Sequence, residues 1–315
     1  MSPSLKQSGS YRGRFAPSPS GPLHFGSLVA ALSSYLDAKV NQGQWLVRIE
    51  DIDTPRVVAG AADEILATLE AYGLYWDEDI VYQSQRHALY QAYLDKLTSD
   101  SLVYACQCTR KQIKAMGGFY NNHCRALTLS WHENALRLQQ HCPVTEFNDA
   151  IQGAVVIPHA LAHEDYIVKR RDGLFAYQLV VVVDDIEQQI NHIVRGADLL
   201  APTARQISLF QQLEQSPPRY AHVPLAVAEP GFKLSKQNHA PAIDTRNPLP
   251  TLHAALRYLN VPVGSVHDYS DIESLLAHAI SVFTLDCVPK VQEIQLDSLE
   301  NGDFAFRPLF SSTSI

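Results

Sequence analysis

The chain has 315 residues, of which 46% are hydrophobic and 18% are charged, and its formal net charge at pH 7 is -8. This composition excludes an intrinsically disordered chain and a small disulfide-stabilised scaffold, and the length predicts two domains or one domain with an insertion. The negative net charge excludes a protein that coats nucleic acid by bulk attraction. The longest apolar run, 179–183, is too short to cross a membrane, and the N-terminus has no secretory h-region.

The first hundred residues alternate between β-type and helical segments. The expected order is a strand at 11–16, a helix with leucines at 28, 32 and 36, a strand at 45–49, a helix at 61–72 and a helix capped by Ser84. Such alternation is typical of a parallel sheet covered by helices, which is the α/β class.

The pattern changes between residues 102 and 167, where a cysteine cluster, a polar helix near 130–140 and a strand at 154–157 indicate an insertion. The α/β pattern resumes with segments at 167–169, 175–183 and 192–194 and a helix at 202–213. Beyond Pro248 we expect only short helices, at 252–259 and 272–283, and a polar tail. These changes divide the chain into a first catalytic half at 11–101, an insertion at 102–167, a second half at 168–245 and a short helical region at 246–315.

A loop rich in proline and small residues joins the first strand to the first helix. Residues 14–27 read Arg-Phe-Ala-Pro-Ser-Pro-Ser-Gly-Pro-Leu-His-Phe-Gly-Ser, at the point where an open α/β sheet presents its binding crevice. The N–H groups at the following helix start favour anions, Gly26 allows close approach to the backbone, and His24 can donate to a phosphoryl oxygen. Taken alone, His24 is more often a partly buried loop residue.

A second motif, Phe-Lys-Leu-Ser-Lys-Gln at 232–237, places two lysines beside a serine. Such cations can clamp a charged transition state, although most runs of this kind are solvated loops. Together the two motifs resemble the HIGH and KMSKS signatures of class I aminoacyl-tRNA synthetases. Residues 14–19, 48–51, 184–185, 194–198 and 233–236 are similar to the glutamyl branch of that class. The resemblance implies a Rossmann-like, doubly wound parallel sheet.

The number of residues after the second motif distinguishes between the members of this glutamyl branch. Of the 315 residues, only 78 follow Gln237, which is too short for the anticodon-binding region of a full glutamyl-tRNA synthetase. The chain therefore resembles the glutamyl-queuosine tRNA(Asp) synthetase family, whose members activate L-glutamate with ATP and Mg²⁺ and attach it to the queuosine base of tRNA(Asp). Ser27 stands where the class signature has a second histidine, which leaves the phosphate contact there open.

Other functions stay as alternatives. A truncated glutamyl- or glutaminyl-tRNA synthetase would charge a tRNA 3′ end, and a catalytically silent paralogue would bind tRNA or a nucleotide. A nicotinamide dehydrogenase is disfavoured, because no G-x-G-x-x-G follows the first strand.

The resemblance implies roles for individual residues. The glutamate pocket would contain Arg14, Phe15, Ala16, Pro17, Ser18, Glu50, Tyr177 and Arg195. Glu50 would pair with the ammonium group, and Tyr177 and Arg195 would hold a carboxylate, which arginine binds in a bidentate manner. The ATP site would contain His24, Gly26, Ser27, Lys233, Ser235 and Lys236, with His24 and Lys236 catalytic. Without the resemblance, Glu50 would be a surface acid and Arg195 an ion-pair partner of Asp198.

Three of the five cysteines, Cys106, Cys108 and Cys124, crowd into one segment. In a reducing compartment such a cluster indicates a metal site before a disulfide, and tetrahedral zinc needs a fourth donor. His123 is the more usual fourth ligand, whereas the family resemblance implies Tyr120. A zinc ion with four protein ligands would be structural, with one ion per chain.

Two basic clusters can contact tRNA phosphates in spite of the negative net charge. They are residues 169–171, and Arg110, Lys111, Lys114 and Arg125. Any single charge run is more often a solvated face. The expected partners are L-glutamate, ATP and tRNA(Asp) carrying queuosine, with no membrane, and we expect a cytoplasmic monomer.

Overall fold

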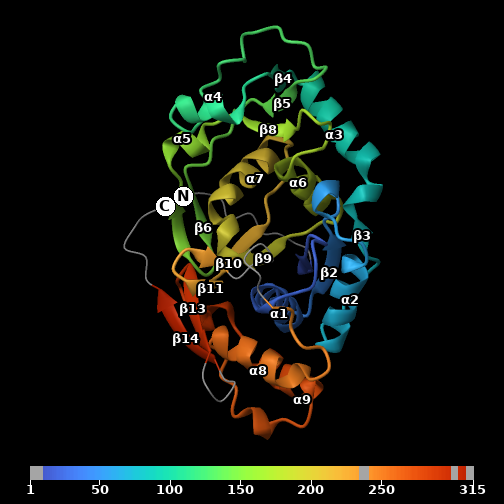
Figure 1. Cartoon of the computed structure of the whole chain (residues 1–315), viewed down its shortest axis with the longest axis vertical. Helices are drawn as coiled ribbons and strands as arrows, with labels where there is room; N and C mark the ends of the chain where they lie inside the picture. The colour runs from blue at the N-terminus through green and yellow to red at the C-terminus, as the bar shows by residue number, and fades with distance from the viewer. Residues whose placement is uncertain (1–9, 234–240, 299–303, 310–315) are drawn as a thin grey trace.

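A parallel sheet lies at the centre of the molecule (Figure 1). The structure is a computed structural model that describes residues 10–233, 241–298 and 304–309. Its strands are β1 (Arg12–Phe15), β2 (Gln44–Ile49), β3 (Val81–Tyr82), β9 (His192–Gly196) and β10 (Arg219–Val223). β1 pairs with β2, β2 with β3, and β9 with β10, all in parallel. The predicted α/β class is therefore confirmed.

Asn191 joins the two groups of strands where β9 lies beside β1. Its side-chain oxygen accepts a hydrogen bond from the backbone N–H of Arg12 at 2.8 Å, and its own backbone N–H donates to the carbonyl of Arg12 at 3.1 Å. The strand order across the sheet is thus β3-β2-β1-β9-β10, so the segments that follow β1, β2 and β9 emerge side by side at one edge.

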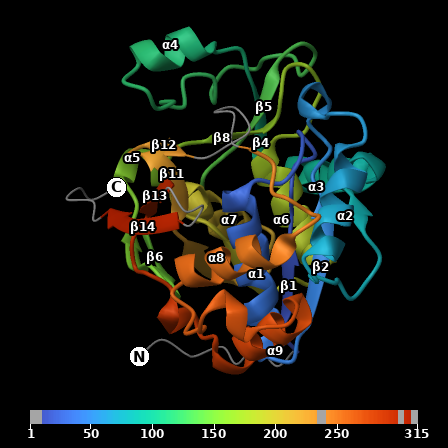
Figure 2. The same cartoon turned by 60° about the horizontal axis from the view of Figure 1, so that its bottom comes forward.

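Two groups of helices pack around the sheet (Figures 1 and 2). One comprises α1 (Phe25–Val40), α2 (Ala61–Ala71), α8 (Pro248–Tyr258) and α9 (Ile272–Val282). The other comprises α3 (His87–Ser99), α6 (Tyr177–Glu187) and α7 (Leu200–Gln212). The leucines at 28, 32 and 36 of α1 are all fully buried, as their helical spacing predicts.

Helix α6 forms from a run of β-branched residues. Leu179 and the four valines that follow are fully buried, in a core that α6 shares with α3, α7 and the insertion. A helix that is apolar on all sides is stable when neighbouring elements enclose it, and here this packing outweighs the weak helix propensity of valine.

The insertion is a small α+β unit at the top of Figure 1. Its antiparallel sheet has the order β4-β5-β8, with β4 (Val103–Cys106), β5 (Ala135–Leu138) and β8 (Tyr166–Lys169). It also contains the hairpin β6 (Glu146–Asp149) and β7 (Gly153–Val156), and the short helices α4 (Arg110–Ala115) and α5 (His159–Ala162). The helix predicted near 130–140 is wrong: β5 pairs on both edges, and Leu136 and Leu138 share one buried face.

Two other predicted features differ from the structure. Ser84 does not cap α3, whose N-cap is Arg86; instead the Ser84 hydroxyl donates to Asp51 Oδ2 at 2.6 Å. The C-terminal region is not only helical, since β13 (Glu293–Ser298) and β14 (Phe304–Leu309) extend the sheet of β11 (Leu225–Glu229) and β12 (Phe232–Lys233). β13 alternates polar and apolar residues, the pattern of a half-buried strand. In the described part of the chain, no helix has the length and apolar character needed to cross a bilayer.

Candidate active site

A cavity of ≈ 280 Å³ opens beyond the carboxyl ends of β1 and β2. Ser18, Glu50 and Tyr177 line it, together with Asp53 and Arg170. Ser18 belongs to the loop after β1, Glu50 directly follows β2, and Tyr177 is the first residue of α6. The carboxyl ends of parallel strands are the usual place for a ligand in an open α/β sheet. The structure therefore brings together three of the residues predicted for the glutamate pocket.

Glu50 is enclosed rather than solvated, since only 9% of its side chain is exposed. Arg48 donates to its Oε1 atom at 3.4 Å, and its backbone N–H donates to the carbonyl of Pro17 at 2.9 Å. Burial raises the pKa of Glu50, while Arg48 and Arg14 oppose the rise. The interpretation of Glu50 as a surface acid is wrong, and a buried carboxylate at a cavity wall is suited to bind an ammonium group.

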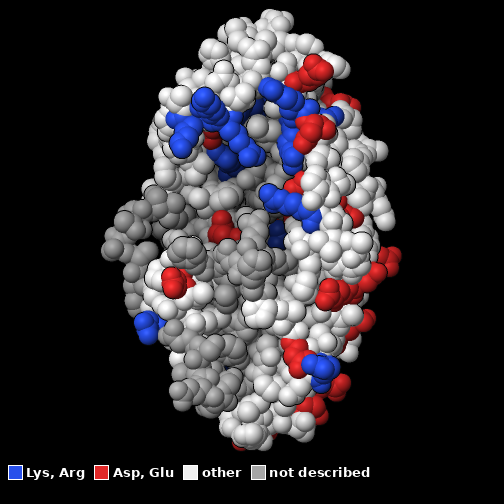
Figure 3. Space-filling view, viewed as in Figure 1, with Lys and Arg blue, Asp and Glu red and all other residues white. Residues whose placement is uncertain are grey.

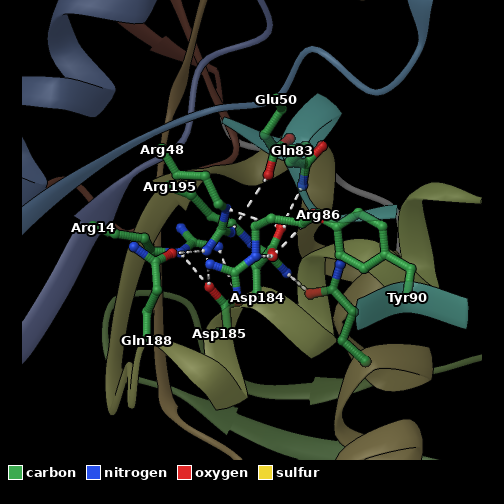
Figure 4. Close-up of polar contacts among 11 residues, drawn as sticks. Arg14, Arg48, Glu50, Gln83, Arg86, Tyr90, Asp184, Asp185, Gln188 and Arg195 are labelled. Carbon is green, nitrogen blue, oxygen red and sulfur yellow. Dashed lines mark hydrogen bonds and ion pairs between the residues drawn. The ribbon is translucent and has the colours of Figure 1, made fainter. Parts of the chain in front are cut away.

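A network of buried charges supports this cavity (Figure 4). Asp185 lies between two arginines: Arg14 Nε donates to its Oδ1 atom at 3.0 Å, and Arg48 Nη1 donates to the same oxygen at 2.9 Å. Arg48 is fully buried, and the Asp185 side chain is 2% exposed. Although burial alone would raise it, the two guanidinium groups hold the pKa of Asp185 below its ordinary value. Asp185 is therefore an ionised counter-charge for both arginines.

The neighbouring Asp184 has a different set of partners. Gln83 Nε2 donates to it at 2.8 Å, the Tyr90 hydroxyl donates at 2.9 Å, and Arg86 Nε lies 2.9 Å from its Oδ1 atom. Burial raises the pKa of Asp184, and Arg48 is the leading opposing charge. The two adjacent acids of α6 thus connect the sheet to α3 and to the segment that precedes it.

Arg195 is the second predicted carboxylate ligand. It lies within β9, and its side chain contacts residues of α7 and β10. Its Nε atom donates to His222 Nε2 at 3.1 Å, and its Nη2 atom donates to Thr203 Oγ1 at 2.7 Å and Gln206 Oε1 at 2.6 Å. The residue is 6% exposed. Arg195 does not itself line the cavity. Burial raises the pKa of Tyr177 on the cavity wall, and the positive charge of Arg195 is the first to oppose this rise.

The remaining glutamate-pocket residues lie on the loop after β1. The Phe15 ring is buried and stacks 6.4 Å from Trp45, so this residue faces the core rather than the cavity. Pro17 is buried as well, and Ala16 is half-buried. For Phe15 and Pro17, any contact with a ligand would come from the backbone.

His24 is the N-cap of α1 and forms a capping box with Ser27. Ser27 N–H donates to His24 Nδ1 at 3.3 Å, and His24 N–H donates to Ser27 Oγ at 2.8 Å. Because Nδ1 accepts, the proton of a neutral His24 lies on Nε2. A Cβ atom at Gly26 would lie 3.3 Å from the His24 ring, so glycine permits this close approach. Ser27 therefore has a helix-capping role where the class signature has its second histidine.

The second motif begins at the end of β12. Ser235 and Lys236 lie outside the described residues, as does the side chain of Lys233. Shortly after this motif, Ala242 forms an antiparallel bridge with His24, and Ile243 N–H donates to the carbonyl of Leu23 at 3.1 Å. The described residues that follow the second motif thus lie directly beside the first.

The three clustered cysteines come together in the insertion. The Sγ atoms of Cys106, Cys108 and Cys124 lie within 4.8 Å of one another. Tyr120 packs in the same cluster, and its hydroxyl accepts from Cys124 N–H at 2.7 Å, whereas His123 is exposed. Three thiol sulfurs this close together are suited to hold a zinc ion, and Tyr120 is nearer to them in the packing than the exposed His123.

Basic side chains gather over the upper part of one face (Figure 3). Arg110, Lys111 and Lys114 of α4 are exposed and have no ion pair among the described residues. Arg171 Nη2 donates to the carbonyl of Gln107 at 2.9 Å, which brings the two predicted basic clusters together. Other members are neutralised in part, since Arg125 pairs with Asp165 at 2.5 Å.

Several buried polar residues were not predicted as part of the site. His222, Thr203 and Gln206 contact Arg195, and Asp149 contacts His222, but these residues lie on elements far apart in sequence. The only local signal is a histidine inside a β-type segment at 219–223. Gln83, Arg86 and Tyr90 were missed for the same reason, because tertiary structure alone brings them to Asp184.

Comparison with known proteins agrees with this geometry. The family model for the catalytic domain of class I tRNA synthetases (E and Q) matches residues 10–247. The glutamyl-Q tRNA(Asp) synthetase of Serratia proteamaculans (strain 568) is 55% identical over 287 residues, 91% of this chain and 95% of that protein. The protein of the same name from Photobacterium profundum is 54% identical over 286 residues, 91% of this chain and 92% of that protein.

A solved structure shows the same fold. A glutamate tRNA ligase from Elizabethkingia meningosepticum CCUG26117, crystallised in complex with its amino acid, matches with a TM-score of 0.76 at 26% identity. The match covers 91% of this chain and 67% of that chain. The chain belongs to the glutamyl-Q tRNA(Asp) synthetase family of the class I aminoacyl-tRNA synthetases.

Proposed function

We propose that this protein activates L-glutamate with ATP and transfers the glutamyl group to the queuosine base of tRNA(Asp). Family membership supports the reaction, and the observation that carries it is the cavity with Ser18, Glu50 and Tyr177 on its wall. Glutamate has one ammonium group and two carboxylates, so its pocket needs an acid and at least one arginine. Arg14, Ser18 and the backbone of residues 15–17 complete the pocket in this proposal.

In the first step, an α-carboxylate oxygen of glutamate attacks the α-phosphorus of ATP. The bond to the β-phosphate breaks, and glutamyl-adenylate and pyrophosphate form. Class I synthetases use ATP with Mg²⁺, and the protein contributes mainly by orienting two anions and neutralising charge. We assign His24 Nε2 as a donor to phosphate, supported by the N–H groups of Gly26 and Ser27. Lys233, Ser235 and Lys236 would clamp the phosphates, with Lys236 catalytic.

In the second step, a hydroxyl of the queuosine cyclopentenediol attacks the activated carbonyl carbon. An ester bond forms, the bond from that carbon to the phosphate oxygen breaks, and AMP leaves. The vicinal hydroxyls of this ring resemble the ribose diol of a tRNA 3′ end, so the same activated glutamate can serve either acceptor chemically. The reaction uses ATP and tRNA, which supports a cytoplasmic location.

Release of pyrophosphate tests the first step, and release of AMP in the presence of acceptor tRNA tests both steps together. In the presence of queuosine-containing tRNA we expect L-glutamate to support AMP formation, and L-glutamine and L-aspartate to support far less. The reason is that Glu50 and Arg195 match the charges of glutamate at one chain length. Equal AMP formation with L-glutamine would contradict an assignment of Arg195 to the side-chain carboxylate of glutamate.

We propose that Cys106, Cys108, Cys124 and Tyr120 hold one structural zinc ion. Replacing Cys124 by serine is expected to remove bound zinc and to lower thermal stability, because zinc coordination contributes directly to folding. Metal analysis of the purified protein measures the first effect. Cys142→Ser is the control, since Cys142 lies outside the cluster. Zinc retained at the wild-type level by Cys124→Ser would contradict the assignment.

The basic surface of α4 is the proposed tRNA contact. The distribution of charges favours α4 over residues 169–171, because Lys169 donates to Gln91 and Arg170 pairs with Asp53 at the cavity. Replacing Arg110, Lys111 and Lys114 by glutamine should weaken tRNA binding and reduce its salt dependence by about one logarithmic unit per lost phosphate contact.

Filter binding over a range of salt concentrations measures this effect. The affinity for glutamate should be unchanged in the triple variant, because α4 contributes no residue to the cavity lining. Lys290→Gln, an exposed change in the C-terminal region, is the control. An unchanged tRNA affinity would sink the proposal, as would an equal loss of glutamate binding.

A further inference from the structure

A chain of three buried residues ends on Arg195. Asp149 Oδ2 lies 2.6 Å from His222 Nδ1, and His222 Nε2 lies 3.1 Å from Arg195 Nε. Asp149 is 4% exposed and His222 is fully buried. Asp149 comes from hairpin β6–β7 of the insertion, His222 from β10 and Arg195 from β9. The insertion is therefore in polar contact with a residue of the proposed glutamate pocket.

The hydrogen bonds fix the tautomer of His222. Arginine Nε can only donate, so His222 Nε2 must accept, and the single proton of the neutral ring must lie on Nδ1. That proton then points at the Asp149 carboxylate. Thr203 Oγ1, 3.1 Å from the same Nε2 atom, already donates to the carbonyl of Leu199 at 2.7 Å. The His222 ring thus donates to the Asp149 carboxylate through Nδ1 and accepts from the Arg195 guanidinium group through Nε2.

Asp149 is itself held in a single orientation. Its Oδ1 atom accepts from the backbone N–H groups of Ile151, Gln152 and His222 at 3.0, 2.9 and 3.1 Å. The Gln152 side chain also donates to the carbonyls of His222 and Val291, both at 2.9 Å. The Oδ2 atom is consequently the one that faces the imidazole.

The guanidinium keeps one nitrogen without a partner. Arg195 Nε and Nη2 donate to His222, Thr203 and Gln206, whereas Nη1 is buried and makes no hydrogen bond within the described residues. A buried donor of this kind is costly unless a ligand satisfies it. We propose that Asp149 and His222 are positioning residues that aim the free Nη1 edge of Arg195 at a carboxylate of glutamate.

This inference rests on the proposed function, because it assumes that Arg195 binds the glutamate substrate. It adds a specific requirement: His222 must be neutral and carry its proton on Nδ1. A second proton on Nε2 would face the Arg195 Nε–H group, donor against donor and charge against charge. Protonation of His222 therefore removes the hydrogen bond that orients the Arg195 guanidinium group.

The charged groups around His222 come from three elements: Asp149 on β6, Arg195 on β9, and Asp198 on the short helix Ala197–Leu199. Burial lowers the pKa of His222 below its ordinary value of 6.5, and Asp149 is the first opposing contact. The contribution of His222 to glutamate affinity should therefore be constant above that value and fall as the pH drops through the lowered pKa. Protonation of Glu50, whose pKa is raised by burial, adds a separate fall at acid pH.

Asp149→Asn is the sharpest test, because the shape of the side chain is unchanged. The three backbone N–H groups force the amide oxygen into the Oδ1 position, so the NH₂ group must face His222 Nδ1. That nitrogen then accepts, the proton moves to Nε2, and the ring opposes Arg195 Nε–H. We expect the dissociation constant of glutamate, measured by calorimetry, to rise about tenfold to hundredfold, with the KM for ATP unchanged.

Two substitutions of His222 form a matched pair. His222→Gln places an acceptor oxygen near the Nε2 position and should keep glutamate affinity within about threefold of wild type. His222→Asn keeps a donor toward Asp149 but offers Arg195 nothing, and should lose affinity as Asp149→Asn does. In the His222→Gln background, Asp149→Asn should cause no further loss. The part of the acid fall in affinity that comes from His222 should disappear, which leaves the part that comes from protonation of Glu50 and of glutamate itself.

The outcomes separate the inference from the proposed function. A wild-type protein that does not bind glutamate would overturn the function. Wild-type binding together with unchanged affinity in Asp149→Asn would overturn the inference, and so would equal losses in the two His222 variants at equal thermal stability. A melting temperature for each variant identifies a loss that comes from unfolding.

Discussion

Replacing Asp185 by asparagine is expected to lower the free energy of unfolding by about 3–5 kcal/mol, the range for breaking a buried ion pair by removing one partner. The negative charge of Asp185 balances the positive charges of two buried guanidinium groups, Arg14 and Arg48. Without Asp185 these two groups would repel each other in a place where no water screens the repulsion. Asparagine keeps the shape and one acceptor oxygen but removes the charge. The same change should weaken glutamate binding, because Arg14 loses its bidentate partner.

Urea denaturation measures the first effect, and an exposed ion pair supplies the control. Arg12 pairs with Glu78 at 2.6 Å, but 40% of the Glu78 side chain is exposed. Glu78→Gln should cost less than about 1 kcal/mol, because water screens an exposed pair. Equal effects of the two substitutions would mean that the buried network does not support the cavity in the way described.

Replacing Arg195 by lysine is expected to raise the KM for glutamate about hundredfold or more, which corresponds to about 2.7 kcal/mol of lost binding. Lysine keeps a positive charge, but its single ammonium group cannot donate to His222, Thr203 and Gln206 and also present a free nitrogen to a carboxylate, as Arg195 Nη1 does. The KM for ATP should change little, since the proposed ATP residues lie on the loop around His24 and on the second motif.

Glutamate-dependent AMP formation at saturating ATP measures this effect. Arg219→Lys is a matched control, because Arg219 begins β10 and is exposed. It should leave both KM values unchanged. A glutamate KM in Arg195→Lys within a few-fold of wild type would mean that Arg195 does not bind glutamate. The positioning of Arg195 by Asp149 and His222 would then have no effect on glutamate binding.

The sequence predicted most of the catalytic framework because local signals and the tertiary structure agree there. The leucine spacing of α1 and the apolar run of β2 are examples of such agreement. The segment at 130–140 failed for the opposite reason: its polar character indicated a solvated helix, but the edges of β4 and β8 select a strand at Ala135–Leu138. Ser84 failed as a cap because Asp51, distant in sequence, binds its hydroxyl.

The residues of the candidate site also fall into two groups, those that the sequence predicted and those that it did not. Glu50, Tyr177 and Ser18 were predicted from the family resemblance, and the structure brings them to one cavity. The residues that hold such groups in place, among them Asp149 and His222, carry no motif. Single polar residues on separate elements form a site only when folding brings their side chains within hydrogen-bond distance. A single sequence read by itself therefore does not reveal them.

The acceptor is the central claim, and one transfer experiment tests it most directly. Labelled glutamate and ATP are supplied with bulk tRNA from cells that make queuosine, and in parallel with tRNA from cells that cannot. The account predicts label in the queuosine-containing tRNA and none in the other. Equal label in both pools would mean that the protein charges a tRNA 3′ end, and would contradict the account.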